Sequence, residues 1–372
     1  MFSGLAVFSL SAGAEPTESL KISPFELSAS YKGDFISNFR GGIKTGTTYL
    51  GLADLFIRFS TENARLWKGG ELLIHGANTH GDEPSANLIG DFQVVSNIEA
   101  GNHSFLYELW YRQQFSKASA TIGLQDLNAE FAVSEVGSNF INSSFGIHPI
   151  ISDNVLAPIF PITSLGATFC WNASSSFNLK TAVYSGCPID FDKNPYNIKW
   201  KTNYLDGLLY IAEGEIMWKS NASLDQTLKV GMFYHQHCDE EEETNAATET
   251  HDYGLYFVGD HHLWSKEQHA LNMFYQIGVS PKNENYCYLG AGCSYTGLLS
   301  KKGKDMLGLA VACGMLNKTK VQNETAVELT YKVNVTDQIF LQPEMQYVVH
   351  PGGTDSQLKN ATVGLIRLGL EF

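Results

Sequence analysis

The chain closes with the stretch Thr362-Val-Gly-Leu-Ile-Arg-Leu-Gly-Leu-Glu-Phe372. Successive side chains of a β-strand point to opposite faces, so Ile366 and Leu368 share one face of this stretch while Arg367 and Glu371 share the other. A strand with apolar residues on one side, a charged pair on the other and an aromatic residue at its end is typical of a wall between hydrocarbon and water. The stretch therefore predicts a protein that crosses a lipid bilayer with strands.

The composition agrees with a many-stranded membrane protein. Charged residues make up 17% and aromatic residues 12% of the 372 residues, with 34 Gly and 17 Tyr, a mixture typical of barrels with aromatic girdles. The longest apolar runs, such as 307–316, contain Gly and fall short of the about 20 residues that a spanning helix needs. We expect an all-β protein without a transmembrane helix.

The net charge and the N-terminus limit the setting further. A formal charge of −14 argues against nucleic acid as a partner, because nucleic acid demands basic patches. Residues 2–10 are apolar and precede Ala12-Gly-Ala14, which matches the apolar region and cleavage site of a secretory signal whose basic start is missing. We expect residues 1–14 to be a truncated signal peptide that is removed, and residues 15–372 to form a single domain.

Segments of alternating polarity recur along the whole chain. Counted back from the C-terminus there are sixteen, near 362–372, 338–348, 325–334, 305–315, 286–298, 268–280, 251–259, 226–235, 207–218, 177–184, 164–171, 119–124, 105–115, 70–76, 47–59 and 25–31. The connections between these segments form two alternating sets. The first set consists of short polar turns, including one near 260–267, and the second set contains all the long connections. The second set lies near 32–46, 77–104, 125–163, 185–206, 238–250, 281–285, 316–324 and 349–360.

This alternation of connections predicts a transmembrane antiparallel β-barrel of sixteen strands. Outer-membrane barrels have short periplasmic turns and long extracellular loops, so we expect the C-terminus at the periplasmic rim and the long loops outside, folding into the lumen. Parity places Phe105 and Tyr107 on the outer face and Glu108, Trp110 and Arg112 on the inner face. A Lys or Arg on the lipid face near the midplane would cost about 2–4 kcal/mol, which favours this assignment.

Seven longer blocks of sequence form an ordered series. They are Gly41-Gly-Ile-Lys-Thr-Gly-Thr47, Gly90-Asp-Phe-Gln-Val-Val-Ser-Asn-Ile-Glu-Ala100, Glu108-Leu-Trp-Tyr111, Gly123-Leu-Gln-Asp-Leu-Asn-Ala-Glu-Phe131, Asn142-Ser-Ser-Phe-Gly-Ile147, Phe160-Pro-Ile-Thr-Ser-Leu-Gly166 and Leu341-Gln-Pro-Glu-Met-Gln-Tyr-Val-Val-His-Pro-Gly-Gly353. In this order they resemble the carbohydrate-selective porins of the OprB family. Six cysteines, His148 and the acidic segment 239–243 depart from the family's pattern.

The resemblance implies a sixteen-stranded outer-membrane barrel in which inward-folded loops form a constriction. It implies facilitated diffusion of sugars such as glucose, guided by Arg, Glu and aromatic side chains, with no catalytic residues. It also implies that the terminal aromatic residue is read by the barrel-insertion machinery.

The residues suited to select a sugar can be named from the chemistry alone. Hydroxyl groups bond to carboxylates, amides and guanidinium groups, and the apolar C–H patches of a sugar lie on aromatic faces. We expect the constriction to be lined by several members of a set comprising Arg58, Glu108, Trp110, Arg112, Gln125, Asp126, Asn128, Glu130, Glu135 and Arg367. The alternative for each of them is an ordinary solvated or wall-bracing residue of the lumen.

Other motifs are weaker. His235, His237 and Asp239 have the spacing of metal ligands, but they fall where a strand leaves the membrane, so surface histidines are expected and no metal or other cofactor. The six cysteines form no CxxC pair. Neither a phosphate-binding loop nor a nucleophile elbow is present, so we do not expect an enzyme.

We therefore expect a sugar-selective outer-membrane porin. Its partners are carbohydrates, outer-membrane lipid and the barrel-insertion machinery, and a homo-oligomer is an option, whereas nucleic acid is not. Three alternatives stay open: a general diffusion porin, a structural envelope protein in which cysteines cross-link neighbouring barrels, and a secreted β-sandwich lectin.

Overall fold

The computed structural model describes residues 23–200, 207–220, 224–240, 247–300, 303–317, 323–353 and 358–372, without the side chains of 237–240 and 247–249. The predicted signal peptide, residues 1–14, lies outside these ranges. The strands are β1 (Phe25–Gly42), β2 (Gly46–Ser60), β3 (Gly70–Gly81), β4 (His103–Gln114), β5 (Ala118–Gln125), β6 (Ser164–Ser174), β7 (Phe177–Ser185), β8 (Leu208–Lys219), β9 (Asp225–Glu240), β10 (Ala247–Lys266), β11 (His269–Val279), β12 (Asn285–Thr296), β13 (Asp305–Leu316), β14 (Glu324–Asn334), β15 (Ile339–Val349) and β16 (Lys359–Glu371).

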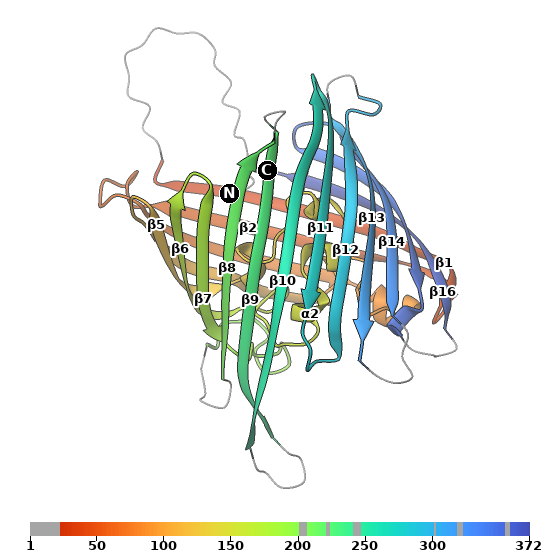
Figure 1. Cartoon of the computed structure of the whole chain (residues 1–372), viewed down its shortest axis with the longest axis horizontal. Helices are drawn as coiled ribbons and strands as arrows, with labels where there is room; N and C mark the ends of the chain where they lie inside the picture. Colours follow the sequence, from red (N-terminus) through yellow and green to blue (C-terminus); the bar gives the residue numbers. More distant parts are fainter. Residues whose placement is uncertain are drawn as a thin grey trace.

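These strands form one closed barrel. Each strand pairs antiparallel with the next in the chain, and β1 closes the ring by pairing antiparallel with β16 (Figure 1). The predicted sixteen-stranded antiparallel barrel is confirmed. Within the described residues, no helix is both long and apolar enough to span a membrane.

The two faces of the wall have opposite polarity. On β16, Ile366 and Leu368 are 48% and 39% exposed on the outside, while Arg367 between them is only 5% exposed and faces inward. Leu309 on β13 and Leu329 on β14 are likewise exposed on the outer face. An apolar outer surface with charges turned inward is what a bilayer requires of a closed sheet.

Strand β4 departs from simple alternation. His75 of β3 pairs with Glu108, but its neighbour Gly76 pairs with Leu106, so Tyr107 is the extra residue of a β-bulge. The bulge shifts the parity of the strand, and both Phe105 and Tyr107 are buried on the inner side. The prediction that these two aromatic residues face outward is therefore wrong.

Two connections are shorter than the sequence suggested. Strand β1 continues to Gly42 and β2 begins at Gly46, so the long loop predicted near 32–46 is wrong. Asn38 stabilises the tight turn, because its side-chain amide donates to the carbonyl oxygens of Gly41 at 2.9 Å and Lys44 at 3.0 Å. The turn predicted near 260–267 is wrong as well, because most of these residues belong to β10. Strand β10 runs to Lys266 and β11 begins at His269, so the turn contains only the two residues between them.

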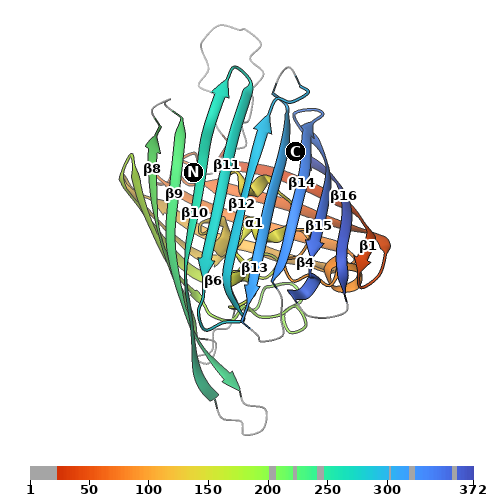
Figure 2. The same cartoon turned by 45° about the vertical axis from the view of Figure 1, so that its right-hand side comes forward.

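The connection 126–163, called the inserted segment below, fills part of the barrel. It carries the short helices α1 (Ser143–Gly146) and α2 (Pro149–Ser152), which lie behind the strands in the two views (Figures 1 and 2). Its apolar side chains form a buried cluster with inward-facing residues of the wall. From the segment this cluster includes Leu127, Phe131, Val136, Phe140, Phe145 and Ile150, and from the wall Tyr184, Ile211, Tyr256, Phe274 and Tyr288.

Carboxylates of the wall hold the backbone of the inserted segment. Glu213 of β8 accepts a hydrogen bond from the amide of Ala132 at 2.9 Å. Glu328 of β14 accepts from the amides of Ile141 and Asn142, each at 2.9 Å. Buried backbone amides need partners, and charges on separate parts of the wall supply them, so the segment is fixed inside the barrel.

A second connection, residues 82–102, is joined to the inserted segment. The amide of Asn97 donates to the carbonyl oxygen of Ile141 at 2.9 Å, and the amide of Ser143 donates to that of Val94 at 3.0 Å. Gln346 of β15 holds the same connection from the wall, donating to the carbonyl oxygen of Val95 at 2.7 Å. The two connections therefore form one structure within the barrel.

Candidate functional site in the barrel lumen

Three predicted site residues lie together on the inner face of β4. The indole Nε1 of Trp110 donates to Glu108 Oε1 at 3.0 Å. The guanidinium carbon of Arg112 lies 4.8 Å from the centroid of the Trp110 ring, within the range of a cation–π contact. Alternate residues of a strand share one face, and this places an acid, an aromatic ring and a base side by side.

The inserted segment adds Glu130 to this group. Arg112 Nη2 donates to Glu130 Oε1 at 2.5 Å, and Arg112 Nε donates to Thr121 Oγ1 at 2.9 Å. Lys180 of β7 donates to the backbone oxygen of Glu130 at 2.9 Å. The side chains of Arg112 and Glu130 remain 14% and 15% exposed, so a solute in the lumen can reach them.

Asp126 completes the group at the start of the inserted segment. The hydroxyl of Tyr107 donates to Asp126 Oδ2 at 2.7 Å, and the amide of Asn128 donates to Oδ1 at 2.8 Å. Burial, and then the negative charge of Glu108, raise the pKa of Asp126 to about 7. We call the set Glu108, Trp110, Arg112, Asp126 and Glu130 the lumen cluster.

The lumen cluster has the chemistry that a sugar needs. Its carboxylates accept hydrogen bonds from hydroxyl groups, its guanidinium donates in a fork, and its indole offers an apolar face. These groups already have partners within the protein, so a passing sugar exchanges one set of hydrogen bonds for another. Such exchange favours weak, reversible contacts, which transport requires.

Two predicted arginines lie apart from the lumen cluster. Arg58, near the end of β2, donates to Glu71 Oε1 at 2.7 Å in a pair whose side chains are 33% and 36% exposed. Arg367 forms a buried, bidentate pair with Asp34 of β1, at 2.7 and 2.8 Å. Arg367 also donates to Asn97 at 2.9 Å, so it ties connection 82–102 to the β1–β16 seam.

Three further predicted residues have separate local partners. Gln125 is buried and donates to the carbonyl oxygen of Gly166 at 2.7 Å. Asn128 donates to the carbonyl oxygens of Phe131 and Gly146, each at 3.2 Å. Glu135 is exposed, and its backbone amide donates to Asp260 at 3.1 Å. Their contacts shape the inserted segment.

The sequence reasoning missed the wall residues that hold the inserted connections. Asp34, His75, Asp260 and Glu328 are all buried, and inward parity was the only signal that could have marked them. His235 is a separate error, because it is buried and its Nε2 lies 2.7 Å from the carbonyl oxygen of Gly186; the predicted surface position is wrong. No group of three metal-ligand side chains occurs among the residues that the structure describes.

The model of the family described as "Carbohydrate-selective porin, OprB family" matches residues 44–372. The chain belongs to the OprB family. Porin B of Pseudomonas aeruginosa is 21% identical to it over 424 aligned residues, covering 97% of this chain and 90% of that protein. The predicted family is confirmed.

Solved structures agree with this assignment at the level of the fold. The high-pH structure of Pseudomonas putida OprB has a TM-score of 0.82 and 18% identity, covering 94% of each chain. The low-pH structure of the same protein has a TM-score of 0.61 and 16% identity, covering 94% of this chain and 93% of that one. OmpT of Vibrio cholerae, in its trimer form, has a TM-score of 0.54 and 11% identity, covering 94% of this chain and 99% of that chain.

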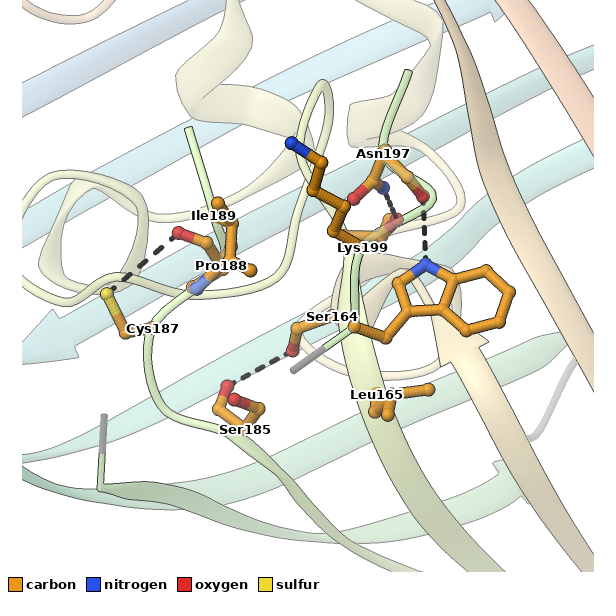
Figure 3. Close-up of a pocket in the computed structure, with 10 residues that line it drawn as sticks. Ser164, Leu165, Ser185, Cys187, Pro188, Ile189, Asn197 and Lys199 are labelled. Atoms are coloured by element: carbon orange, nitrogen blue, oxygen red, sulfur yellow. Dashed lines mark hydrogen bonds between the residues drawn. The ribbon is translucent and has the colours of Figure 1, made fainter. Parts of the chain in front are cut away.

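A small cavity lies away from the lumen cluster of this OprB-family chain. Figure 3 shows it between the start of β6 and the connection after β7, where Ser164 donates to the carbonyl oxygen of Ser185 at 3.1 Å. The indole of Trp200 closes one side by donating to the carbonyl oxygen of Asn197 at 2.8 Å. With about 20 Å³, the cavity has room for about one water molecule and is too small for a sugar.

Proposed function

We propose that this protein is an outer-membrane channel through which carbohydrates diffuse down their gradient, and that the lumen cluster contacts the sugar as it passes. The observation that carries the proposal is the contact of the Trp110 indole with Glu108 and Arg112, together with the pairing of Arg112 with Glu130. Membership of the OprB family and the name Porin B of the relative support the same function.

The arrangement favours neutral, hydroxyl-rich solutes. Arg112 and Glu130 form a charge pair, so that part of the cluster presents a donor and an acceptor with little net charge. A hexose can bond to both while its C–H face lies on an aromatic ring. An ion gains no comparable combination of contacts there.

The orientation in the membrane is part of the proposal. The C-terminus and the start of β1 lie on the side of the barrel that carries turns such as Glu267–Gln268 between β10 and β11 (Figure 1). Outer-membrane barrels turn their short connections toward the periplasm. We therefore assign Phe372 to the periplasmic rim and the connections 82–102 and 126–163 to the extracellular side.

A planar-bilayer titration tests the sugar contact. Ion current through the full-length protein is recorded while glucose or maltose is added, with a polyethylene glycol of similar hydrodynamic size as the control solute. We expect glucose to reduce the current in a saturable manner, because a bound sugar occupies the lumen. Current that is unaltered by both sugars, or reduced equally by the control solute, would indicate a general diffusion porin.

A further inference from the structure

His75 lies in the middle of β3 with both ring nitrogens facing carboxylates. Its Nε2 is 3.0 Å from Asp54 Oδ1 on β2, and its Nδ1 is 3.3 Å from Glu108 Oε2 on β4. A neutral imidazole has one N–H donor, whereas an imidazolium has two. Only the protonated ring can donate to both carboxylates, so the geometry calls for an imidazolium beneath the lumen cluster.

The surroundings leave the His75 ring little freedom. The ring of Phe56 lies 4.0 Å away between centroids, and that of Tyr107 lies edge-on at 4.9 Å. The His75 side chain is 6% exposed. Asp54 is held in turn by Ser30, whose hydroxyl donates to it at 3.0 Å. The ring therefore stays between its two acceptors.

Three acidic groups and a phenol face or adjoin this imidazole. They are Asp54 on β2, Glu108 and Tyr107 on β4, and Asp126 at the start of the inserted segment. Three carboxylates close together repel one another, and one imidazolium offsets part of that repulsion. The net charge of this acidic group therefore depends on the proton of His75 and on that of Asp126, whose pKa is about 7.

We propose that His75 is a positioning residue of the channel, and that its imidazolium holds Glu108 in place and sets the charge that permeating solutes meet at the lumen cluster. The proposal rests on the function proposed above, in which Glu108 contacts the sugar. When His75 loses its proton, Glu108 loses a hydrogen-bond donor. The net charge of the group formed by His75 and the neighbouring carboxylates then becomes more negative by one unit. The channel then favours cations more strongly and binds sugar differently.

The test is the reversal potential of the full-length protein in planar bilayers under a KCl gradient, measured from pH 5 to pH 9. For the wild type we expect the ratio of K⁺ to Cl⁻ permeability to rise by at least about twofold as the pH increases, because fixed charge in a narrow channel controls ion entry. The uncharged His75→Gln variant should show a clearly smaller rise, limited to the part that the ionisation of Asp126 contributes. His80→Gln, on the outer face of the same strand, serves as the matched control and should retain it.

Other outcomes separate this proposal from the sugar function. A His75→Gln channel with the wild-type pH profile would overturn the role of His75 and leave sugar transport intact. Sugars that fail to reduce the wild-type current, together with a pH response that depends on His75, would instead contradict the sugar function alone. If His75→Gln lacks the heat-modifiable migration of a folded barrel, Glu108→Gln provides a second variant: the pH dependence of sugar block should disappear, and its persistence would overturn the proposal.

Discussion

At the scale of single residues, the inner face of β4 carries the proposed selectivity. Trp110 and Arg112 contact one another directly, and Glu130 reaches Arg112 from the inserted segment. The same wall also carries charges with a structural role, such as the buried Arg367. Alternation in the sequence places both kinds of charged residue on the inner face. Only their burial and their contact partners in the structure distinguish them.

Replacing Glu108 and Arg112 together by Ala should weaken sugar binding more than it weakens the barrel. A hydrogen bond to a charged group contributes about 1.5–3 kcal/mol, so we expect the loss of both groups to raise the apparent sugar Kd by at least about tenfold. Sugar block of ion current measures this change, and thermal unfolding in detergent measures the stability. The matched control is Arg58→Ala with Glu71→Ala, a more exposed pair; equal sugar affinity in both double variants would remove Glu108 and Arg112 from the site.

Replacing Arg367 by Ala should lower the stability of the barrel more than it lowers the affinity for sugar. Arg367→Ala leaves the buried Asp34 carboxylate without its bidentate partner, and breaking a buried pair in this way costs about 3–5 kcal/mol. Chemical unfolding should show this loss, whereas Arg58→Ala should cost about 0–1 kcal/mol because its pair is largely solvated. Adding Asp34→Asn to Arg367→Ala should restore part of the stability. Equal losses for the two single variants would contradict the structural role of Arg367.

At the scale of elements, the two inserted connections decide how the lumen is divided. The wall supplies acceptors such as Glu328 for amides of the segment, while Phe140 and Phe145 pack against Phe274 of β11. A polar lumen therefore contains its own apolar core. Neither connection could stay in place by packing alone, since its buried amides also need partners.

Glu328→Gln should loosen the inserted segment while the barrel stays closed. The neutral side chain cannot act as a charged acceptor for the amides of both Ile141 and Asn142, and each such bond contributes about 1.5–3 kcal/mol. Limited proteolysis should cut within 126–163 several times faster than in the wild type, and channel noise should increase. Glu135→Gln, an exposed change in the same segment, is the control. Equal protection of both variants would show that Glu328 does not anchor the segment.

The connection 82–102 should respond to pH through Glu99. Burial, and then the negative charge of Asp91, raise the pKa of Glu99 from its ordinary value of 4.5 to about 8. A carboxyl group that holds its proton more tightly in the folded state stabilises it fully below pH 4.5, and this contribution is lost as the pH rises to about 8. Hydrogen exchange of residues 82–102 should therefore accelerate over this range. Glu99→Gln should flatten the profile, and an unchanged profile would rule out Glu99 as the cause.

Much of the element structure could be predicted from alternation, and the errors have local causes. Regular alternation placed Arg367 and Arg112 correctly on the inner face. The bulge at Tyr107 turns Phe105 and Tyr107 to the inner face, although alternation had placed them outside. Alternation cannot reveal a bulge, because the pairing with the partner strand decides where it forms. His235 was assigned to the surface because the sequence of its own strand does not indicate that His235 contacts the distant Gly186.

At the scale of the whole molecule, closure explains how so polar a lumen exists in a membrane protein. Each of the described strands β1 to β16 has two partners in the ring, so none of them exposes an unpaired edge to lipid. The terminal strand β16 pairs with β1 through Arg367 and Asp34 as well as through the backbone. The family and the strand order could be recognised from sequence, whereas the partners of each lumen charge depend on contacts between residues far apart in the chain.

The most direct test of a sugar-selective channel is the swelling of liposomes that contain the purified full-length protein. Glucose, the linear polyol sorbitol and maltose are compared at equal osmolarity. We predict that glucose enters faster than sorbitol of nearly equal mass, and that Glu108→Ala with Arg112→Ala abolishes this difference. Entry rates that follow solute size alone, in the wild type and in the variant, would contradict sugar selection by the lumen cluster.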